Sequence, residues 1–116
     1  MDCIFCKIAK KEASAEILYE DELVVAFSDV RPFAPVHILI IPKEHIESIA
    51  DLEDKHEKLA GRLVMVAKKL ADKAGIAKNG YKLLFRVGRH GGQEVPHVHL
   101  HLIGGAQLAE GIHPIK

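Results

Sequence analysis

Hydrophobic residues recur every three or four positions between residues 54 and 74, which is the spacing of a helix with one buried face. Gly75 follows directly, and glycine often ends a helix because it adopts a left-handed backbone without strain. His56 stands among charged residues in the predicted first turn, so we expect it to be solvated and assign it no role. The apolar positions of this long helix are Leu59, Leu63, Val66, Ala67, Leu70 and Ala74.

The other hydrophobic runs are short and rich in β-branched residues, as strands are. They predict an α+β fold in which a five-stranded, mostly antiparallel sheet is accompanied by one long and one short helix. We expect a single domain over residues 1–116. The predicted segments are residues 16–20 and 23–28 as a hairpin, 37–41 as a central strand ending at Pro42, 42–46 as the start of a short helix or turn, 81–87 as an edge strand and 96–103 as the last strand.

Residues 97–103 place three histidines in strict alternation with apolar residues. In a strand this period of two puts His97, His99 and His101 on the same face. The glycine-containing segment 91–95 precedes them and can bring backbone N–H groups close to a ligand. Because imidazole acts as a nucleophile and, when protonated, as an acid, this row suits phosphoryl or nucleotidyl transfer. A three-histidine metal site is the alternative use.

Composition narrows the possible partners. Lys and Arg number 16 and Asp and Glu number 16, so the net charge is zero and predicts no general attraction to nucleic acid or acidic membranes. The apolar run at residues 36–41 is too short to span a membrane, and the N-terminus lacks the apolar core of a signal peptide. We therefore expect a cytoplasmic protein.

The two cysteines, Cys3 and Cys6, are separated by two residues, which suits half of a metal site or a redox pair. Their place at the chain terminus weakens the redox interpretation. A tetrahedral zinc ion needs two further ligands, and the candidate histidines are His45, His97, His37 and His56. Asp29 follows a predicted strand, where it either accepts hydrogen bonds from a pair of ligand hydroxyls or simply belongs to a connecting loop.

Residues 97–103 (HVHLHLI) resemble the motif of the histidine-triad superfamily. The similarity extends to residues 3–8, 27–30, 35–46 and 91–93. Because glycines flank the motif at residues 91–92 and 104–105, the chain is most similar to the histidine-triad nucleotide-binding branch, in its zinc-containing bacterial form. The dinucleoside-polyphosphate hydrolase branch is less similar.

The resemblance implies a homodimer with one continuous sheet, which hydrolyses the P–N bond of purine nucleoside 5′-phosphoramidates through a nucleotidyl-histidine intermediate. By this resemblance, His99 matches the nucleophile, His101 and Gln93 the groups that hold the α-phosphate, and His37 a supporting histidine. A nucleotide-binding regulatory module with little turnover and a dinucleoside polyphosphate hydrolase are the alternatives. The predicted edge strand and the helix stripe are consistent with a symmetric dimer.

The same resemblance assigns the remaining binding positions. Asp29 matches the residue that holds the ribose hydroxyls, and a structural zinc ion, with no catalytic metal required, is implied at one four-residue set. The residues that match the base pocket are Phe5, Ile8, Phe27 and Val30, and those that match the zinc ligands are Cys3, Cys6, His45 and His97.

Two positions depart from the family pattern. Arg86 stands where Asn is common, and Glu94 stands where a hydroxyl residue is common. An acidic side chain near the leaving group could alter proton delivery or repel an anionic substrate. Arg86 could compensate by pairing with Glu94 or by contacting phosphate.

Overall fold

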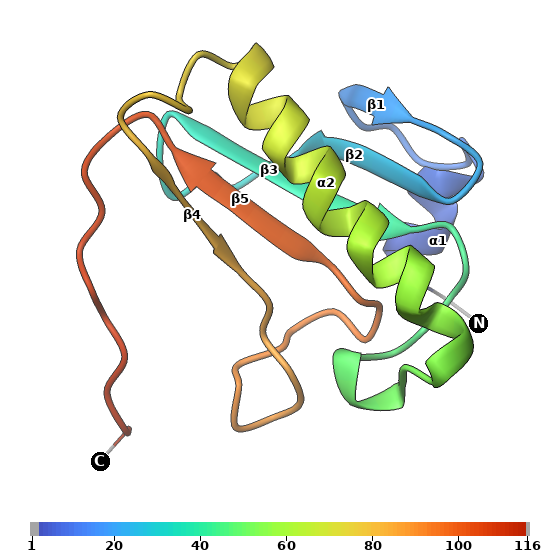
Figure 1. Cartoon of the computed structure of the whole chain (residues 1–116). Coiled ribbons are helices and arrows are strands. Elements are labelled where there is room, and N and C mark those ends of the chain that lie inside the picture. Colours follow the sequence, from blue (N-terminus) through green and yellow to red (C-terminus); the bar gives the residue numbers. More distant parts are fainter. Residues whose placement is uncertain (1–2, 116) are drawn as a thin grey trace.

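A single antiparallel sheet organises the structure, a computed structural model that describes residues 3–115 (Figure 1). The strand order is β1-β2-β3-β5-β4, so β3 is central and β4 is an edge strand. The predicted α+β fold with five antiparallel strands is therefore confirmed. The elements are α1 (Ile4–Ala9), β1 (Ile17–Glu20), β2 (Val24–Ser28), β3 (Val36–Pro42), η1 (Ile49–Asp51), η2 (Asp54–His56), α2 (Glu57–Lys73), β4 (Tyr81–Leu84) and β5 (Leu100–Gly104).

The central strands are apolar on both faces because each face is covered by a different helix. Val24 and Ala26 of β2 face the core beneath α2, whereas Val25 and Phe27 face the smaller core that contains α1. The same alternation in β3 explains why residues 37–41 read as a continuous hydrophobic run. In Figure 1 the long α2 helix crosses one face of the sheet, and α1 lies behind the other.

The long helix agrees with the predicted apolar stripe. Leu59, Leu63, Val66 and Leu70 are buried against the sheet of their own chain, and Gly75 has the positive φ, 77°, expected after a helix. This stripe is therefore used within the fold and does not itself provide a dimer surface. None of the helices within residues 3–115 combines the length and apolarity that crossing a membrane requires.

Several boundaries differ from the prediction. The short helix is α1, which follows Cys3, whereas residues 43–44 form a bend and residues 45–48 have no regular secondary structure. The last strand begins at Leu100 because Pro42, opposite the preceding residues, has no N–H to continue the ladder. Val98 instead donates its N–H to the Ile46 carbonyl, 2.8 Å away.

The expectation that His56 is solvated is wrong. Its ring is buried and accepts a hydrogen bond from the Glu53 backbone N–H at 3.0 Å, while Nε2 lies 3.3 Å from Glu44. The ring closes the N-terminal end of the α2 region, where free backbone N–H groups need acceptors. A local pattern of charged neighbours did not reveal this contact.

Candidate active site and metal-binding cluster

The three histidines of the row lie on the face of the sheet opposite α2. Val98, Leu100 and Leu102 fill the core under that helix, so the intervening side chains point the other way, as the alternation predicted. Only His101 lies within the regular strand. The rings of His99 and His101 are 5.0 Å apart between centroids, and the Phe5 ring packs edge-on against His99 at 5.1 Å.

Backbone contact fixes which nitrogen of His99 is free. Its Nδ1 lies 2.7 Å from the carbonyl oxygen of His97, which can only accept a hydrogen bond. Nδ1 therefore carries the hydrogen, and Nε2 of the neutral ring keeps its lone pair. This is the arrangement that a nucleophilic imidazole requires.

His37 and His101 are linked across β3 and β5. The Phe33 backbone N–H donates to His37 Nδ1 at 3.1 Å, so the neutral ring carries its hydrogen on Nε2. That Nε2 lies 2.9 Å from His101 Nδ1, to which it donates. His101 consequently carries its own hydrogen on Nε2 and presents a donor to the site.

Burial keeps this row of imidazoles uncharged at neutral pH. Burial is the main cause that lowers the pKa of His37 and of His99. Burial, with the charges of His99, Arg86 and His37, lowers the pKa of His101 to about 4. Neutral rings are what the assigned hydrogen positions demand, so the geometry and the electrostatics agree.

Asp29 and Gln93 both lie near this row, and both use polar side-chain atoms for contacts within the chain. Asp29 Oδ2 is 3.4 Å from His37 Nε2, and Oδ1 accepts from the Arg31 N–H at 2.8 Å. The Gln93 amide accepts from Gly88 N–H at 2.9 Å and donates to the carbonyls of Glu47 at 2.6 Å and Val95 at 3.0 Å. Gln93 therefore ties down the loop that leads into the row.

The four residues matched to a base pocket fall into two groups. Phe5, Ile8 and Phe27 are buried in the core around α1, and the Phe5 and Phe27 rings meet edge-on at 5.5 Å. Val30, by contrast, is 89% exposed on the loop after β2. The structure brings the first three together and leaves Val30 at the surface.

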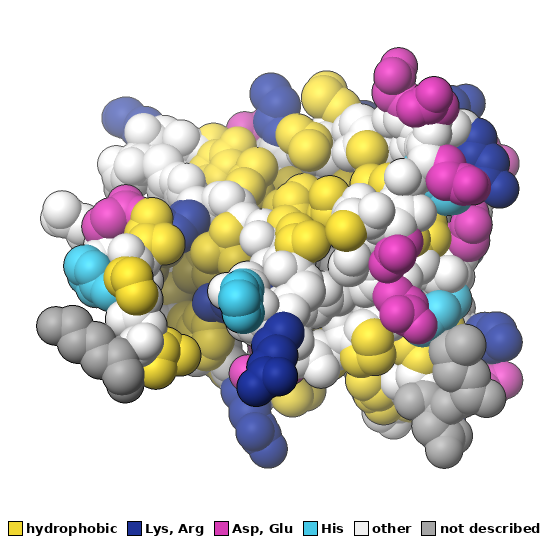
Figure 2. Space-filling view, turned by 90° about the horizontal axis from the view of Figure 1, so that it is seen from below, with side chains coloured by type: hydrophobic (Ala, Val, Ile, Leu, Met, Phe, Trp, Pro, Cys, Tyr) yellow, Lys and Arg dark blue, Asp and Glu magenta, His cyan; other side chains and the backbone are white. Residues whose placement is uncertain are grey.

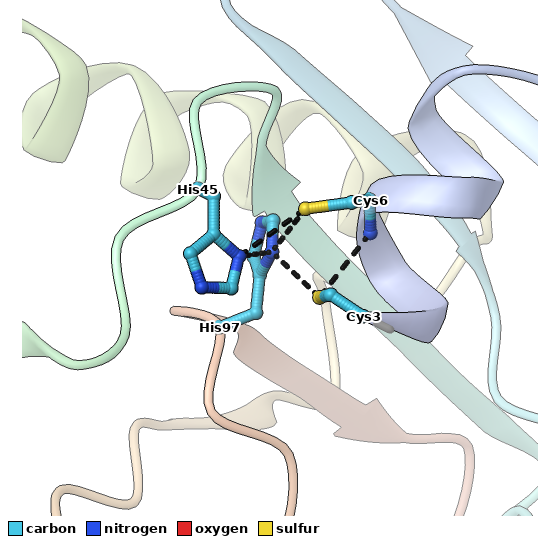
Figure 3. A group of neighbouring side chains, drawn as sticks. All are labelled: Cys3, Cys6, His45 and His97. Atoms are coloured by element: carbon cyan, nitrogen blue, oxygen red, sulfur yellow. Dashed lines mark hydrogen bonds between the residues drawn. The ribbon is translucent and has the colours of Figure 1, made fainter. Parts of the chain in front are cut away.

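A second cluster joins the N-terminus to the row (Figure 3). His97 Nδ1 lies 3.3 Å from Cys3 Sγ and 3.5 Å from Cys6 Sγ, and His45 Nδ1 lies 3.2 Å from Cys6 Sγ. The two histidine Nδ1 atoms are 3.2 Å apart. The ligand atoms of these four residues lie within 4.8 Å of one another, so the cluster could hold a metal ion.

The donor set fits a tetrahedral ion. Zinc bonds of about 2.0–2.3 Å separate ligand atoms by roughly 3.3–3.8 Å, close to the distances in this cluster. His97 Nε2 is 2.9 Å from the Pro42 carbonyl and donates to it, which leaves Nδ1 free as a ligand. Of the four candidate histidines only His45 and His97 join the cysteines, since His37 contacts His101 and His56 contacts Glu44.

Two residues at the site had no firm role from sequence alone. Phe33 packs on His37 with 4.9 Å between ring centroids, and its N–H fixes the His37 tautomer. Arg86 lies with Nη1 3.4 Å from His101 Nε2 and its guanidinium carbon 5.8 Å from the centre of the Phe33 ring. The proposed Arg86–Glu94 pair is absent from the ion pairs of the described residues. In the sequence, Arg86 stood out only because it replaces the Asn that is common at this position of the family.

The antiparallel sheet, with a nucleophile-competent His99 beside a hydrogen-bonded His37–His101 pair, defines a histidine-triad protein. Comparison with known sequences agrees, because the model of the HIT domain family matches residues 10–108. The chain belongs to this family.

The relatives of the chain include enzymes. It is 49% identical over 107 residues to the purine nucleoside phosphoramidase of Escherichia coli strain K12, covering 92% of this chain and 90% of that protein. It is 44% identical over 103 residues to the protein HitA of Neisseria gonorrhoeae, covering 89% and 95%.

Solved structures show the same fold. A HIT family hydrolase from Legionella pneumophila Philadelphia 1 superposes with a TM-score of 0.91 at 49% identity, covering 93% of this chain and 96% of that one. A histidine triad protein from Clostridium difficile superposes with a TM-score of 0.93 at 41% identity, covering 97% of each.

Proposed function

We propose that the chain hydrolyses the P–N bond of purine nucleoside 5′-phosphoramidates. The observation that carries the proposal is the fixed tautomer of His99, whose Nδ1 is bound to the His97 carbonyl at 2.7 Å and whose Nε2 is free to attack. The 49% identity to a purine nucleoside phosphoramidase supports this choice of substrate.

We infer the following reaction, which the positions of the rings support. His99 Nε2 attacks the α-phosphorus and bonds to it while the P–N bond of the substrate breaks, and the leaving nitrogen takes a proton from solvent and departs as the amine. We assign His101 Nε2–H as the donor to one oxygen of the phosphoryl group, and His37 holds that tautomer through the 2.9 Å bond. Water then attacks the phosphorus, the bond between phosphorus and His99 Nε2 breaks, and the water's proton is released to solvent, which frees the monophosphate and restores neutral His99. No step requires a catalytic metal.

Substrate recognition uses the surrounding residues. We assign the ribose hydroxyls to Asp29, whose carboxylate is one-fifth exposed beside His37, and the base to the buried Phe5, Ile8 and Phe27 together with the exposed Val30. Gln93 supports the phosphate site by fixing its loop, and direct contact with phosphate would require it to release one of its backbone bonds.

We further propose that Cys3, Cys6, His45 and His97 hold a structural zinc ion, on the evidence of their tetrahedral donor set. His97 would then serve the metal and leave catalysis to His99 and His101. Both cysteines are free thiols, which a reducing cytoplasm preserves for metal binding.

A homodimer completes the proposal. The edge strand β4 has an exposed Leu83, and α2 exposes Val64 and Met65, so pairing through this side would cover apolar surface. Figure 2, which views the molecule from below the orientation of Figure 1, shows hydrophobic side chains gathered over the middle of the face, with most of the acidic side chains toward the right.

The test is release of amine from a purine 5′-phosphoramidate under multiple-turnover conditions. We expect steady release that greatly exceeds one equivalent per chain. Tight binding of a purine monophosphate without amine release would instead identify a regulatory nucleotide-binding module. Faster cleavage of dinucleoside polyphosphates than of the phosphoramidate would favour the polyphosphate hydrolase activity.

A further inference from the structure

The contact between Arg86 and His101 is not a hydrogen bond. Arg86 Nη1 lies 3.4 Å from His101 Nε2, and guanidinium nitrogens can only donate. The chain of bonds from the Phe33 N–H through His37 fixes the hydrogen of neutral His101 on that same Nε2. Two hydrogen-bond donors, Arg86 Nη1 and His101 Nε2, therefore lie next to each other, and neither can accept a hydrogen bond from the other.

The Arg86 side chain is held in this position by its surroundings. Its guanidinium lies over the face of Phe33, with 5.8 Å from the guanidinium carbon to the ring centre. Gly92 lies alongside the stem of Arg86, and a Cβ at that position would come within 3.6 Å of Arg86 Cδ. Among the ion pairs of residues 3–115, none joins a carboxylate to the Arg86 guanidinium. The positive charge is thus available to a ligand.

We propose that Arg86 and His101 form a two-donor seat for a phosphoryl oxygen, and that the Arg86 charge biases the site toward dianionic nucleoside monophosphates. This inference rests on the proposed function. One oxygen can accept from Arg86 Nη1 and His101 Nε2 together, which satisfies both donors.

The preference for dianions follows from charge. A hydrogen bond from a neutral donor strengthens only modestly as the ligand's negative charge increases, whereas the Coulomb attraction of a guanidinium grows in proportion to that charge. A phosphoramidate ester carries one negative charge and the monophosphate product carries nearly two at neutral pH. Arg86 should therefore hold the product more tightly than the substrate and slow its release. The positive charge also lowers the pKa of His101 beside it, which keeps that ring a neutral donor.

The experiment compares three ligands with the same nucleoside: adenosine, which has no phosphoryl group, adenosine 5′-methyl phosphate, which carries one negative charge, and adenosine 5′-monophosphate, which carries nearly two. Calorimetry on the parent and on Arg86→Gln should show a loss of about tenfold or more in Kd for the monophosphate, about threefold for the methyl ester and less than twofold for adenosine. Arg86→Lys keeps the positive charge but not the planar guanidinium with its several donors. Its affinity for the monophosphate should therefore fall less than that of Arg86→Gln. Arg89→Gln removes an exposed arginine from the neighbouring loop and should change none of the three.

The outcomes separate the two proposals. An equal loss for all three ligands in Arg86→Gln, or an unchanged Kd for the monophosphate, would overturn the Arg86 seat while leaving the proposed function in place. A parent chain that binds none of the three ligands would overturn both. A loss that grows from adenosine to the monophosphate, together with partial rescue by Arg86→Lys, would support the seat.

Discussion

His37 Nε2 lies 2.9 Å from His101 Nδ1, and this bond determines which atom His101 presents to a ligand. Because the Phe33 N–H occupies His37 Nδ1 at 3.1 Å, the hydrogen between the two rings belongs to His37. His101 must then carry its hydrogen on Nε2. The buried ring of His37 thus controls the chemistry of a residue 64 positions away in the sequence.

Replacing His37 tests this relationship. His37→Leu removes the donor, and we expect kcat to fall about tenfold to a hundredfold with a smaller change in KM, as for other residues that orient a functional imidazole. His37→Gln offers an amide donor and should recover part of the loss. Nitrogen NMR of His101 should show a mixture of tautomers in His37→Leu. A single unchanged His101 tautomer in that variant would contradict the role of His37.

His99→Asn should separate binding from turnover. Asparagine is similar in polarity but has no ring nitrogen to form the intermediate, so we expect Kd for a purine monophosphate to stay within about tenfold of the parent, roughly 1.4 kcal/mol. Turnover of the phosphoramidate should fall by orders of magnitude. His90→Asn, in the exposed loop before the row, is the matched control. A similar rate in His99→Asn and the parent would remove His99 as nucleophile.

The pKa of His101 gives a defined pH dependence of stability. Its folded value of about 4 lies below the ordinary 6.5, so the unfolded chain binds more protons between these values. The contribution of this ring to the free energy of unfolding should therefore be complete above pH 6.5 and be lost as the pH falls toward 4, by at most about 3 kcal/mol.

Urea unfolding of the parent and of His101→Gln at pH 7 and pH 4.5 measures this contribution. Both proteins share the other titrating groups, including the metal cluster, so the difference between their pH dependences isolates the His101 ring. We expect the parent to lose more stability on acidification than His101→Gln. Equal losses would show that His101 titrates at an ordinary value in the folded protein.

The cysteine–histidine cluster predicts one zinc ion per chain. Elemental analysis of protein purified without chelator should give a ratio near one, and Cys3→Ser or His45→Asn should reduce it. Removal of the metal should lower Tm, because the ion links the N-terminal segment to the chain before β5. His90→Asn should keep full zinc content. A ratio well under one in the parent would rule out the structural zinc site.

The exposed edge of the sheet predicts a symmetric dimer. Light scattering at micromolar concentration should give twice the chain mass. Leu83→Lys on β4 should shift the protein toward monomer, because it places a charge on the edge that the dimer would bury. Val30→Lys adds the same charge at an exposed loop position and should leave the mass unchanged. A monomeric parent would contradict the dimer.

The sequence by itself determined the elements whose signal is periodic. The three-and-four spacing located α2, the apolar run located the central β3, and the alternation around His99 placed the histidines on one face. Each of these signals is local, because a side chain's face depends only on backbone geometry within a few residues. The resemblance carried by residues 97–103 then identified the family.

Only the tertiary structure decided the contacts between distant segments. Three findings depend on such contacts: His56 is buried, His45 and His97 are the partners of the cysteines, and Arg86 lies close to His101. Each of these contacts is between residues that are far apart in the sequence. The same holds for hydrogen positions, since the tautomer of His101 depends on the Phe33 N–H through His37. The hydrophobic pattern of the sequence does not predict these contacts, because they form only when strands and loops pack together after the strand registers are fixed.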